Sequence, residues 1–352
     1  MEKLTAKAVV NNGLKPFKDE DGYWTFTKKK GEDFRILQLT DLHYGGSIFT
    51  KKKDAFCKNL IIKIVETAKP DLIVVTGDMV FPIPVIGGTI NNLKSTNEII
   101  ELFESFDIPW TVVYGNHDVE PMAMYKKSTL SKAYENAKNC LFTRGRDDLS
   151  GEGNYMIKVL NEDGSINTAL MMIDSNMYVE KGIAGFYSGF DNIHDDQIDW
   201  YKQEILKISK GGSLVPSLAF FHIPPNEFKE AWKKYTRNGG DSEVKWFLGE
   251  VGETNDYFGV PKFKGNFFKE MVDFGSCKGM FMGHDHLNTV SIEYKGIRLT
   301  YGMSVDYLAY RGIMKWSSQR GGTMINIKDD STFDVSLLPL DEVAPTLNKV
   351  QK

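Results

Sequence analysis

The stretch FRILQLTDLH, residues 34–43, decides the fold. Its first part is a short run of mostly apolar residues, which predicts a buried β-strand. The run ends abruptly at Asp41 and His43, two polar side chains separated by one residue. A turn residue beside a hydrogen-bonded histidine would explain such a pair taken alone, so its meaning depends on the residues at the ends of the other predicted strands.

The first half of the chain alternates strand patterns with helical ones. After the first strand, apolar residues recur at helical spacing over 56–68 and again over 99–106. The next two strand patterns are DLIVVTGD (71–78) and IPWTVVYGNHD (108–118). This β-α-β-α-β order predicts parallel strands joined by right-handed crossovers.

The second half is richer in strand patterns. Seven runs between residues 154 and 327 have this character: NYMIKVL, TALMMIDS, LAFFHIP, KGMFMGHD, TVSIEY, IRLTYG and GTMINI. One helix is predicted over 195–208. Three segments of weak periodicity, 120–150, 180–194 and 226–262, are expected to be long loops, which in compact proteins are usually functional or mobile.

No linker-like tract divides the chain, so we expect one α/β domain over residues 1–352. Its core is expected at about 34–305, with a strand or hairpin within 1–33. Further strands are expected within 306–340, and a short tail at 341–352.

Polar clusters lie at the ends of five of the predicted strands, and they contain five of the six histidines. The clusters are Asp41-Leu42-His43, Gly77-Asp78, Gly115-Asn116-His117-Asp118, the single His222, and Gly283-His284-Asp285-His286. Each cluster alone is a weak signal, but open α/β sheets gather ligand-binding residues at the carboxyl ends of their strands. Their joint occurrence predicts one functional site.

The donor types indicate metal chemistry. Imidazole and carboxylate without thiolate suit zinc, iron or manganese rather than calcium. Seven donors are too many for one tetrahedral ion and about right for two ions that share a carboxylate: Asp41, His43, Asp78, Asn116, His222, His284 and His286. Two such ions can clamp the attacking and leaving oxygens of an in-line displacement at phosphorus and acidify a bridging water.

These motifs, in this order, resemble the calcineurin-like metallophosphoesterase superfamily over residues 34–305. The resemblance implies a four-layer α-β-β-α sandwich of two mixed sheets flanked by helices, and a hydrolase that acts on phosphoric esters. It implies that Asp78 bridges two metal sites. Asp41, His43 and His286 would complete one site, and Asn116, His222 and His284 the other.

By the same resemblance, His117 would be catalytic rather than a ligand. It would stabilise the transition state or protonate the leaving oxygen, with Asp118 orienting its ring. Asn116, His117 and Tyr44 are the expected substrate-binding residues. Two divalent or mixed-valence ions (Zn, Mn or Fe) are expected, and no organic cofactor.

The chain is most similar to the purple-acid-phosphatase-like branch of this superfamily, and it departs from that branch at one position. True purple enzymes place a tyrosine three residues after the shared aspartate, where this chain has Phe81. Phenylalanine cannot coordinate iron, so we expect no tyrosinate colour and favour two divalent ions.

Other residues are expected to play lesser roles. We expect His194 to face solvent, Asp174 to form a turn or bond a ligand histidine, and Asp285 to point away from the metals. Surface charge is favoured over phosphate binding for Arg144, Arg146 and Arg311. Tyr187 is, like Tyr44, a candidate for the substrate pocket.

Composition limits the partners. The net charge of −4 and the pI near 5.9 argue against stable nucleic-acid binding. No apolar stretch approaches the length of a membrane span, and the amino terminus does not have the pattern of a signal peptide. Three scattered cysteines suit a reducing interior, so a cytoplasmic protein is expected.

The sequence supports three functional hypotheses. The leading one is a phosphomonoesterase that acts on a phosphorylated small molecule. A phosphodiesterase, for cyclic nucleotides or other diesters, would use the same dinuclear centre. The third is a non-catalytic protein-binding scaffold of the same fold, although such scaffolds typically lose metal ligands or the catalytic histidine, which this chain keeps.

Overall fold

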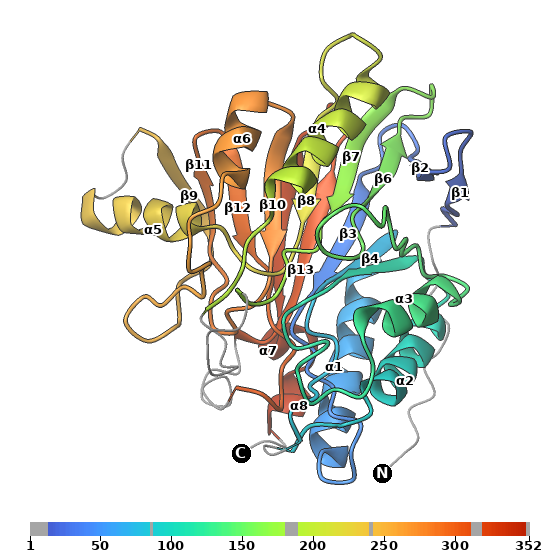
Figure 1. Ribbon diagram of the computed structural model, residues 1–352, viewed down its shortest axis with the longest axis vertical. Coiled ribbons are helices and arrows are strands. Elements are labelled where there is room, and N and C mark those ends of the chain that lie inside the picture. The colour runs from blue at the N-terminus through green and yellow to red at the C-terminus, as the bar shows by residue number, and fades with distance from the viewer. Residues whose placement is uncertain (1–12, 85–86, 180–188, 239–241, 311–318, 350–352) are drawn as a thin grey trace.

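The computed structural model describes residues 13–84, 87–179, 189–238, 242–310 and 319–349, and their strands form two sheets (Figure 1). The larger sheet has the order β1 (Phe17–Lys18), β2 (Trp24–Thr27), β6 (Tyr155–Leu160), β7 (Ile166–Met172), β8 (Ser217–Phe220), β10 (Cys277–Met282), β12 (Ile297–Tyr301), β11 (Ser291–Tyr294) and β9 (Val244–Leu248). The smaller sheet has the order β14 (Phe333–Pro339), β13 (Gly321–Ile327), β3 (Phe34–Leu39), β4 (Leu72–Thr76) and β5 (Trp110–Val113). Both sheets combine parallel and antiparallel pairs.

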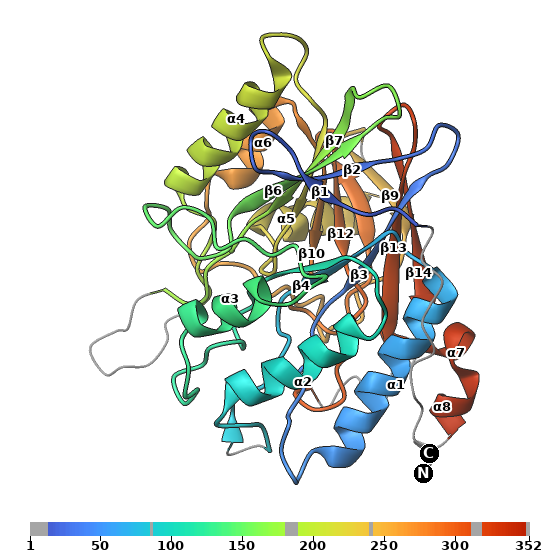
Figure 2. The same ribbon diagram turned by 90° about the vertical axis from the view of Figure 1, so that its right-hand side faces the viewer.

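Helices lie on the outer side of each sheet. Those beside the smaller sheet are α1 (Lys51–Ala68), α2 (Asn92–Glu104) and α3 (Lys127–Glu135), and those beside the larger one are α4 (Asp195–Ser209), α5 (Asn226–Asn238) and α6 (Phe267–Phe274) (Figures 1 and 2). Two short helices, α7 (Leu340–Val343) and α8 (Pro345–Lys349), come after the last strand. The expected four-layer sandwich of two mixed sheets is confirmed. None of the described helices has the length and apolar character needed to cross a bilayer.

The strands of the larger sheet separate two apolar cores by simple alternation of their side chains. In β10, Phe281 faces the core shared with the smaller sheet, whereas Met280 and Met282 face the core under α4, α5 and α6. The neighbouring strand β8 repeats the pattern, with Phe220 in the shared core and Ala219 on the helix side. Successive side chains of a strand point to opposite faces, so near-continuous apolar runs mark strands that are buried on both faces.

In each sheet the parallel strands have their carboxyl ends at one edge, and these two edges lie next to each other. In the smaller sheet, β3 pairs with β4 and β4 with β5, all parallel, as the alternating sequence pattern predicted. In the larger sheet, β8, β10 and β12 are parallel neighbours. The polar clusters of both halves of the sequence therefore come after strands that end at the same side of the sandwich.

Two of the three expected loops contain regular structure, so these expectations were wrong in part. The segment 120–150 includes α3, in which only Leu130, Ser131 and Tyr134 are buried, a pattern too sparse to recognise from sequence. The segment 226–262 includes α5 and the edge strand β9. The helical spacing of Phe228, Ala231, Trp232 and Tyr235 in α5 was a signal that the sequence analysis missed. The other element, β9, is a short edge strand with two exposed residues.

We propose that the chain forms one domain, because the two sheets share a single continuous core that includes residues from both. The expected amino-terminal hairpin corresponds to β1 and β2, which are antiparallel. The expected carboxy-terminal strands correspond to β13 and β14. The three cysteines are buried and form no disulfide.

Substituting Phe281 by alanine tests the shared core. Its ring is fully buried, stacks on Phe220 at 5.1 Å between centroids and contacts Phe333 at 5.8 Å. We expect Phe281→Ala to lower the free energy of unfolding by about 3–5 kcal/mol, measured by urea denaturation. Phe49→Ala is the matched control, because Phe49 is 84% exposed and its loss should change stability by less than about 0.5 kcal/mol. Equal effects of the two substitutions would contradict a core shared between the sheets.

Candidate metal centre

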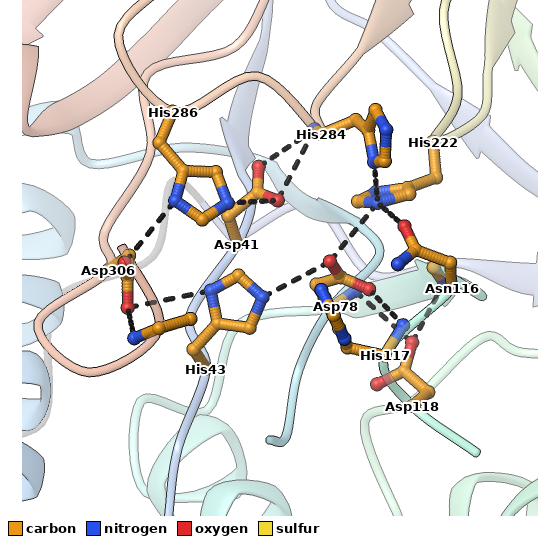
Figure 3. Close-up of polar contacts among 12 residues, drawn as sticks. Asp41, His43, Asp78, Asn116, His117, Asp118, His222, His284, His286 and Asp306 are labelled. Atoms are coloured by element: carbon orange, nitrogen blue, oxygen red, sulfur yellow. Dashed lines mark hydrogen bonds and ion pairs between the residues drawn. The ribbon is translucent and has the colours of Figure 1, made fainter. Parts of the chain in front are cut away.

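Seven polar side chains from distant segments converge at the carboxyl ends of the strands (Figure 3). Four come after β3, β4 and β5 of the smaller sheet, and three come after β8 and β10 of the larger sheet. They are the seven donors that the sequence predicted: Asp41, His43, Asp78, Asn116, His222, His284 and His286. All but His284, which is partly exposed, are buried.

The first group surrounds His43 and His286. His286 Nε2 lies 3.5 Å from Asp41 Oδ1, and His43 Nε2 lies 3.1 Å from Asp78 Oδ2. Asp41, His43 and His286 each offer a donor atom within 4.8 Å of the other two. This group can hold one cation.

The second group surrounds His222. Its Nε2 lies 3.1 Å from Asn116 Oδ1, 3.2 Å from Asp78 Oδ2 and 3.3 Å from His284 Nδ1. The Nδ1–H of His222 donates to the Thr76 carbonyl at 2.8 Å, which leaves Nε2 as the nitrogen that faces the group and would ligate a cation.

These separations fit metal ligation. Donors placed about 2.1 Å from a tetrahedral ion stand roughly 3.4 Å apart, and the separations measured here run from 3.1 to 3.5 Å. The same atom, Asp78 Oδ2, lies within 3.2 Å of an imidazole from each group. The residues present therefore fit two cations that share one carboxylate oxygen.

Asp306 is a site residue that sequence reasoning missed. Its fully buried carboxylate lies between two candidate ligands, with Oδ1 3.5 Å from His43 Nδ1 and Oδ2 3.3 Å from His286 Nδ1. It also accepts the backbone N–H groups of Leu308, Ala309 and Tyr310 at 2.7–2.8 Å. A carboxylate on the far nitrogen of an imidazole fixes its tautomer and orientation. The only sequence signal was an aspartate a few residues beyond the strand IRLTY, without a motif around it.

The backbone of the centre is held in an unusual conformation. Four of the candidate donors, Asp41, His43, Asp78 and His284, have positive φ angles of 51°, 45°, 54° and 82°. Such angles are uncommon outside glycine and cluster at functional sites. At Gly115 a side chain has no room, because a Cβ would lie 2.1 Å from Asp78 Oδ1.

Asp118 does not orient the ring of His117, so that expectation is corrected. Its carboxylate is fully buried and accepts the backbone N–H groups of Gly115, Asp78, Met79 and Val80 at 2.8–3.4 Å. It therefore ties the loop after β5 to the loop after β4, since four backbone donors occupy both of its oxygens. Burial and, after it, the nearby Asp78 carboxylate raise the pKa of Asp118 to about 6.

His117 has a different carboxylate beside it. Glu120 Oε1 lies 2.7 Å from its Nδ1, whereas its backbone N–H donates to Asp78 Oδ1 at 2.8 Å. A ring nitrogen of His117 also lies within 4.8 Å of donor atoms of His43 and Asp78. The side chain is 24% exposed and lines a cleft over the two groups.

This cleft has a volume of about 450 Å³. The described residues that form its walls are largely aromatic, and among them two carry carboxylates, Asp285 and Glu253. The other lining residues include Phe81, Ile83, Phe190, Thr254, Tyr257, Ala309 and Tyr310. The Phe81 ring meets the rings of His43 and His117 edge-on, each at 5.3 Å between centroids. Phe81 thus lies beside the centre and offers no phenolate oxygen, the group that a tyrosine would supply to an iron ion.

Tyr44, which the sequence analysis expected to bind substrate, does not line this cleft. It is buried, its hydroxyl donates to Glu98, and it lines a separate hollow with Lys51, Lys58 and Lys94. Arg311 and Tyr187 lie outside the described residues. Asp285 points away from the donors, as expected, and accepts the Tyr301 hydroxyl at 2.5 Å and the Gly259 N–H at 3.0 Å.

The remaining candidates make local contacts. His194 is the N-cap residue before α4, and its ring contacts Ser150 at 3.0 Å and Asp191 at 3.1 Å. Asp174 Oδ1 accepts the Asn176 backbone N–H at 3.0 Å, the turn contact that was one of the two expectations, and Oδ2 accepts from Lys127 Nζ at 2.5 Å instead of from a ligand histidine. Two surface arginines pair with acidic neighbours, Arg144 with Asp147 and Glu152, and Arg146 with Asp148.

The fold and the donor set together are those expected of the metallophosphoesterase class. The model of the calcineurin-like phosphoesterase family matches residues 34–288, and the chain belongs to that family. A dimetal phosphatase from Danio rerio has a similar fold, with a TM-score of 0.53 at 11% identity over 88% of this chain and 96% of that one.

The chain is also similar in sequence to proteins that are named as phosphatases, including purple acid phosphatases. "Probable inactive purple acid phosphatase 28" of Arabidopsis thaliana is 27% identical over 302 residues, which cover 79% of this chain and 71% of that protein. "Phosphatase DCR2" of Saccharomyces cerevisiae is 29% identical over 279 residues, which cover 72% of this chain and 44% of that protein.

Metal loading is expected to depend steeply on pH. Burial alone would lower the pKa of His43, but Asp306 and Asp78 outweigh burial and raise that pKa to about 9. The Asp78 carboxylate likewise outweighs burial at His222 and raises its pKa to about 9. Without metal both imidazoles therefore hold a proton at neutral pH, and a cation must displace it.

We expect the affinity of the metal-free protein for Zn²⁺ to fall by at least about tenfold per ion for each unit that the pH is lowered from 8 to 6. The fall should be steeper for the group of His43, because nearby carboxylates also raise the pKa of His286 well above its usual value despite its burial. Calorimetric titration in buffers of different ionisation enthalpy would also count the protons released. An affinity that does not change between pH 6 and 8 would contradict the protonated state of His43 and His222.

Proposed function

We propose that this protein is a dinuclear metal-dependent phosphoesterase that hydrolyses phosphomonoesters. The observation that carries the proposal is the position of Asp78 Oδ2, within 3.2 Å of His43 Nε2 and of His222 Nε2. One buried carboxylate oxygen shared by two groups of imidazoles is the arrangement that a pair of bridged cations requires.

The proposed ligand sets correspond to the two groups. Asp41, His43, Asp78 and His286 would hold one ion, and Asp78, Asn116, His222 and His284 the other. Imidazole with carboxylate and amide oxygen suits Zn, Mn or Fe, and two divalent ions are favoured because Phe81 offers no phenolate. When bound, the two ions supply a hydroxide nucleophile near neutral pH and neutralise charge on the phosphoryl oxygens.

His117 is the proposed proton donor. It lines the cleft beside both groups and keeps one ring nitrogen for the substrate, because Glu120 faces the other. As the nucleophile's oxygen bonds to phosphorus and the ester P–O bond breaks, the protonated imidazole gives its proton to the departing oxygen. The products are an alcohol and phosphate, and His117 is left neutral.

The intact donor set supports activity over a scaffold role. Three of the curated relatives are named as probably inactive, and those names apply to those proteins. This chain keeps all seven donors together with His117, all of which converge on the centre. A phosphodiesterase would use the same centre, so the ester preference depends on the cleft walls.

Two substitutions separate the metal-binding and proton-donating roles. Asp78→Asn replaces the shared carboxylate with a neutral amide, so we expect the bound metal to fall from two ions per chain to one or fewer. His117→Ala removes the proposed proton donor, so we expect two ions to remain while kcat falls by about 10²-fold or more. Metal content is measured by inductively coupled plasma mass spectrometry and kcat with p-nitrophenyl phosphate. An unchanged kcat in His117→Ala would show that the role assigned to His117 is wrong.

The ester preference is tested with a reconstituted protein. After loading with Zn²⁺, Mn²⁺ or Fe²⁺, kcat/KM is compared for p-nitrophenyl phosphate and bis(p-nitrophenyl) phosphate. We expect the monoester to be hydrolysed at least about tenfold more efficiently, which corresponds to a difference of about 1.4 kcal/mol in transition-state binding. A preference for the diester would replace the monoesterase proposal with the phosphodiesterase, and no hydrolysis of either by protein that holds two ions would favour a scaffold.

A further inference from the structure

The carboxylate beside His117 belongs to no motif of the sequence. Glu120 lies three residues after His117 in the loop after β5, and its side chain is 9% exposed. Its Oε1 lies 2.7 Å from His117 Nδ1. The aspartate next to His117 in sequence is fully occupied by backbone donors, so Glu120 is the acidic side chain that faces this ring.

The same oxygen of Glu120 has a second contact. The hydroxyl of Tyr178 donates to Glu120 Oε1 at 2.8 Å and accepts from Asn116 Nδ2 at 2.9 Å. The amide nitrogen of Asn116 thereby faces Tyr178, which directs the amide oxygen to the other side, 3.1 Å from His222 Nε2. An asparagine can ligate a cation only through its oxygen, so this hydrogen bond selects the useful orientation of the amide.

Tyr178 is itself held in place by its surroundings. The backbone on both sides of it pairs with a second segment, through Val179 N to Gly189 O at 3.0 Å and Asp191 N to Met177 O at 3.2 Å. Its ring stacks on Phe190 at 5.7 Å between centroids, and the Phe190 ring meets His284 edge-on at 4.2 Å. The hydroxyl is therefore presented from a supported position rather than from a free side chain.

We propose that Glu120 and Tyr178 are positioning residues that act together on two neighbours, Glu120 on His117 and Tyr178 on Asn116. Glu120 Oε1 is the ion-pair partner of His117 Nδ1 at 2.7 Å. In the proposed role it would accept the Nδ1 proton in a hydrogen bond during the reaction, which fixes the ring and leaves Nε2 for the leaving oxygen. Tyr178 orients the Asn116 amide so that the amide oxygen points toward the second cation. The hydrogen bond from the Tyr178 hydroxyl to Glu120 connects the two positioning residues. The inference rests on the proposed function, because it assigns these residues to that reaction.

The chain offers matched controls for both residues. Tyr44 and Glu98 form another tyrosine–glutamate pair, with the Tyr44 hydroxyl donating to Glu98, and this pair lines a hollow away from the candidate donors. Glu98→Ala and Tyr44→Phe therefore remove the same chemical groups without touching His117 or Asn116.

For Glu120, kcat, KM and metal content are measured with p-nitrophenyl phosphate and phenyl phosphate. Glu120→Ala should keep two ions per chain and a KM within about twofold, while kcat falls about tenfold or more and falls further for phenyl phosphate, whose poorer leaving group needs the proton more. Glu120→Gln keeps an oxygen that can accept the Nδ1 proton and should restore most of kcat. Equal losses with both esters, or loss of metal in Glu120→Ala, would overturn the positioning role.

For Tyr178, the readout is metal content alone. Tyr178→Phe should lower the bound metal from two ions toward one, because the Asn116 amide loses the partner that orients it, with a loss of affinity of about 10- to 100-fold at that site. Full occupancy in Tyr178→Phe, or an equal loss in Tyr44→Phe, would refute this part. If the parent protein binds two ions but hydrolyses neither ester, the proposed function fails while the result for Tyr178 still stands.

Discussion

The structure depends on one buried negative charge shared between two groups of imidazoles. Asp78 is almost fully buried, and its Oδ2 lies 3.1 and 3.2 Å from His43 and His222, while its Oδ1 accepts the His117 backbone N–H at 2.8 Å. An isolated carboxylate in such a place would be costly, and burial alone raises its pKa. The surrounding imidazoles, His222 first and then His117, reverse this effect and hold the pKa well below its usual range. The loops from both sheets are arranged to keep that charge ionised.

Much of the fold and of the centre could be predicted from sequence, for a definite physical reason. Apolar runs buried on both faces identified β3, β4, β5, β8 and β10, and each ended in polar residues that a buried strand does not need. The signal failed where it depended on tertiary contact. Asp306 lies in an irregular segment and contacts His43 and His286 from there. Glu120 takes the position beside His117 that was expected for Asp118, because Asp118 accepts hydrogen bonds from backbone N–H groups of two loops. No local pattern encodes either choice.

Close packing explains the glycines in the motifs, and the motif loops also contain residues with strained backbone angles. Gly283 comes before the two histidines after β10, and a Cβ there would lie 1.9 Å from Thr40 Oγ1. The neighbouring aspartates and histidines take left-handed backbone angles at a conformational cost of order 1–3 kcal/mol each. The loops can hold such conformations because the strands on either side are fixed by a well-packed core. The rigid sandwich and the strained loops are therefore two parts of one arrangement.

The origin of the donors has a consequence for the cohesion of the whole molecule. Asp41, His43, Asp78 and Asn116 come after strands of one sheet, whereas His222, His284 and His286 come after strands of the other. A cation held by donors from both sheets would crosslink them non-covalently. Binding of such a cation raises the free energy of unfolding by about 4 kcal/mol when the free metal concentration is one thousand times the dissociation constant. Chelation would then loosen the two layers from each other, and resistance to proteolysis would report how much metal a cell supplies.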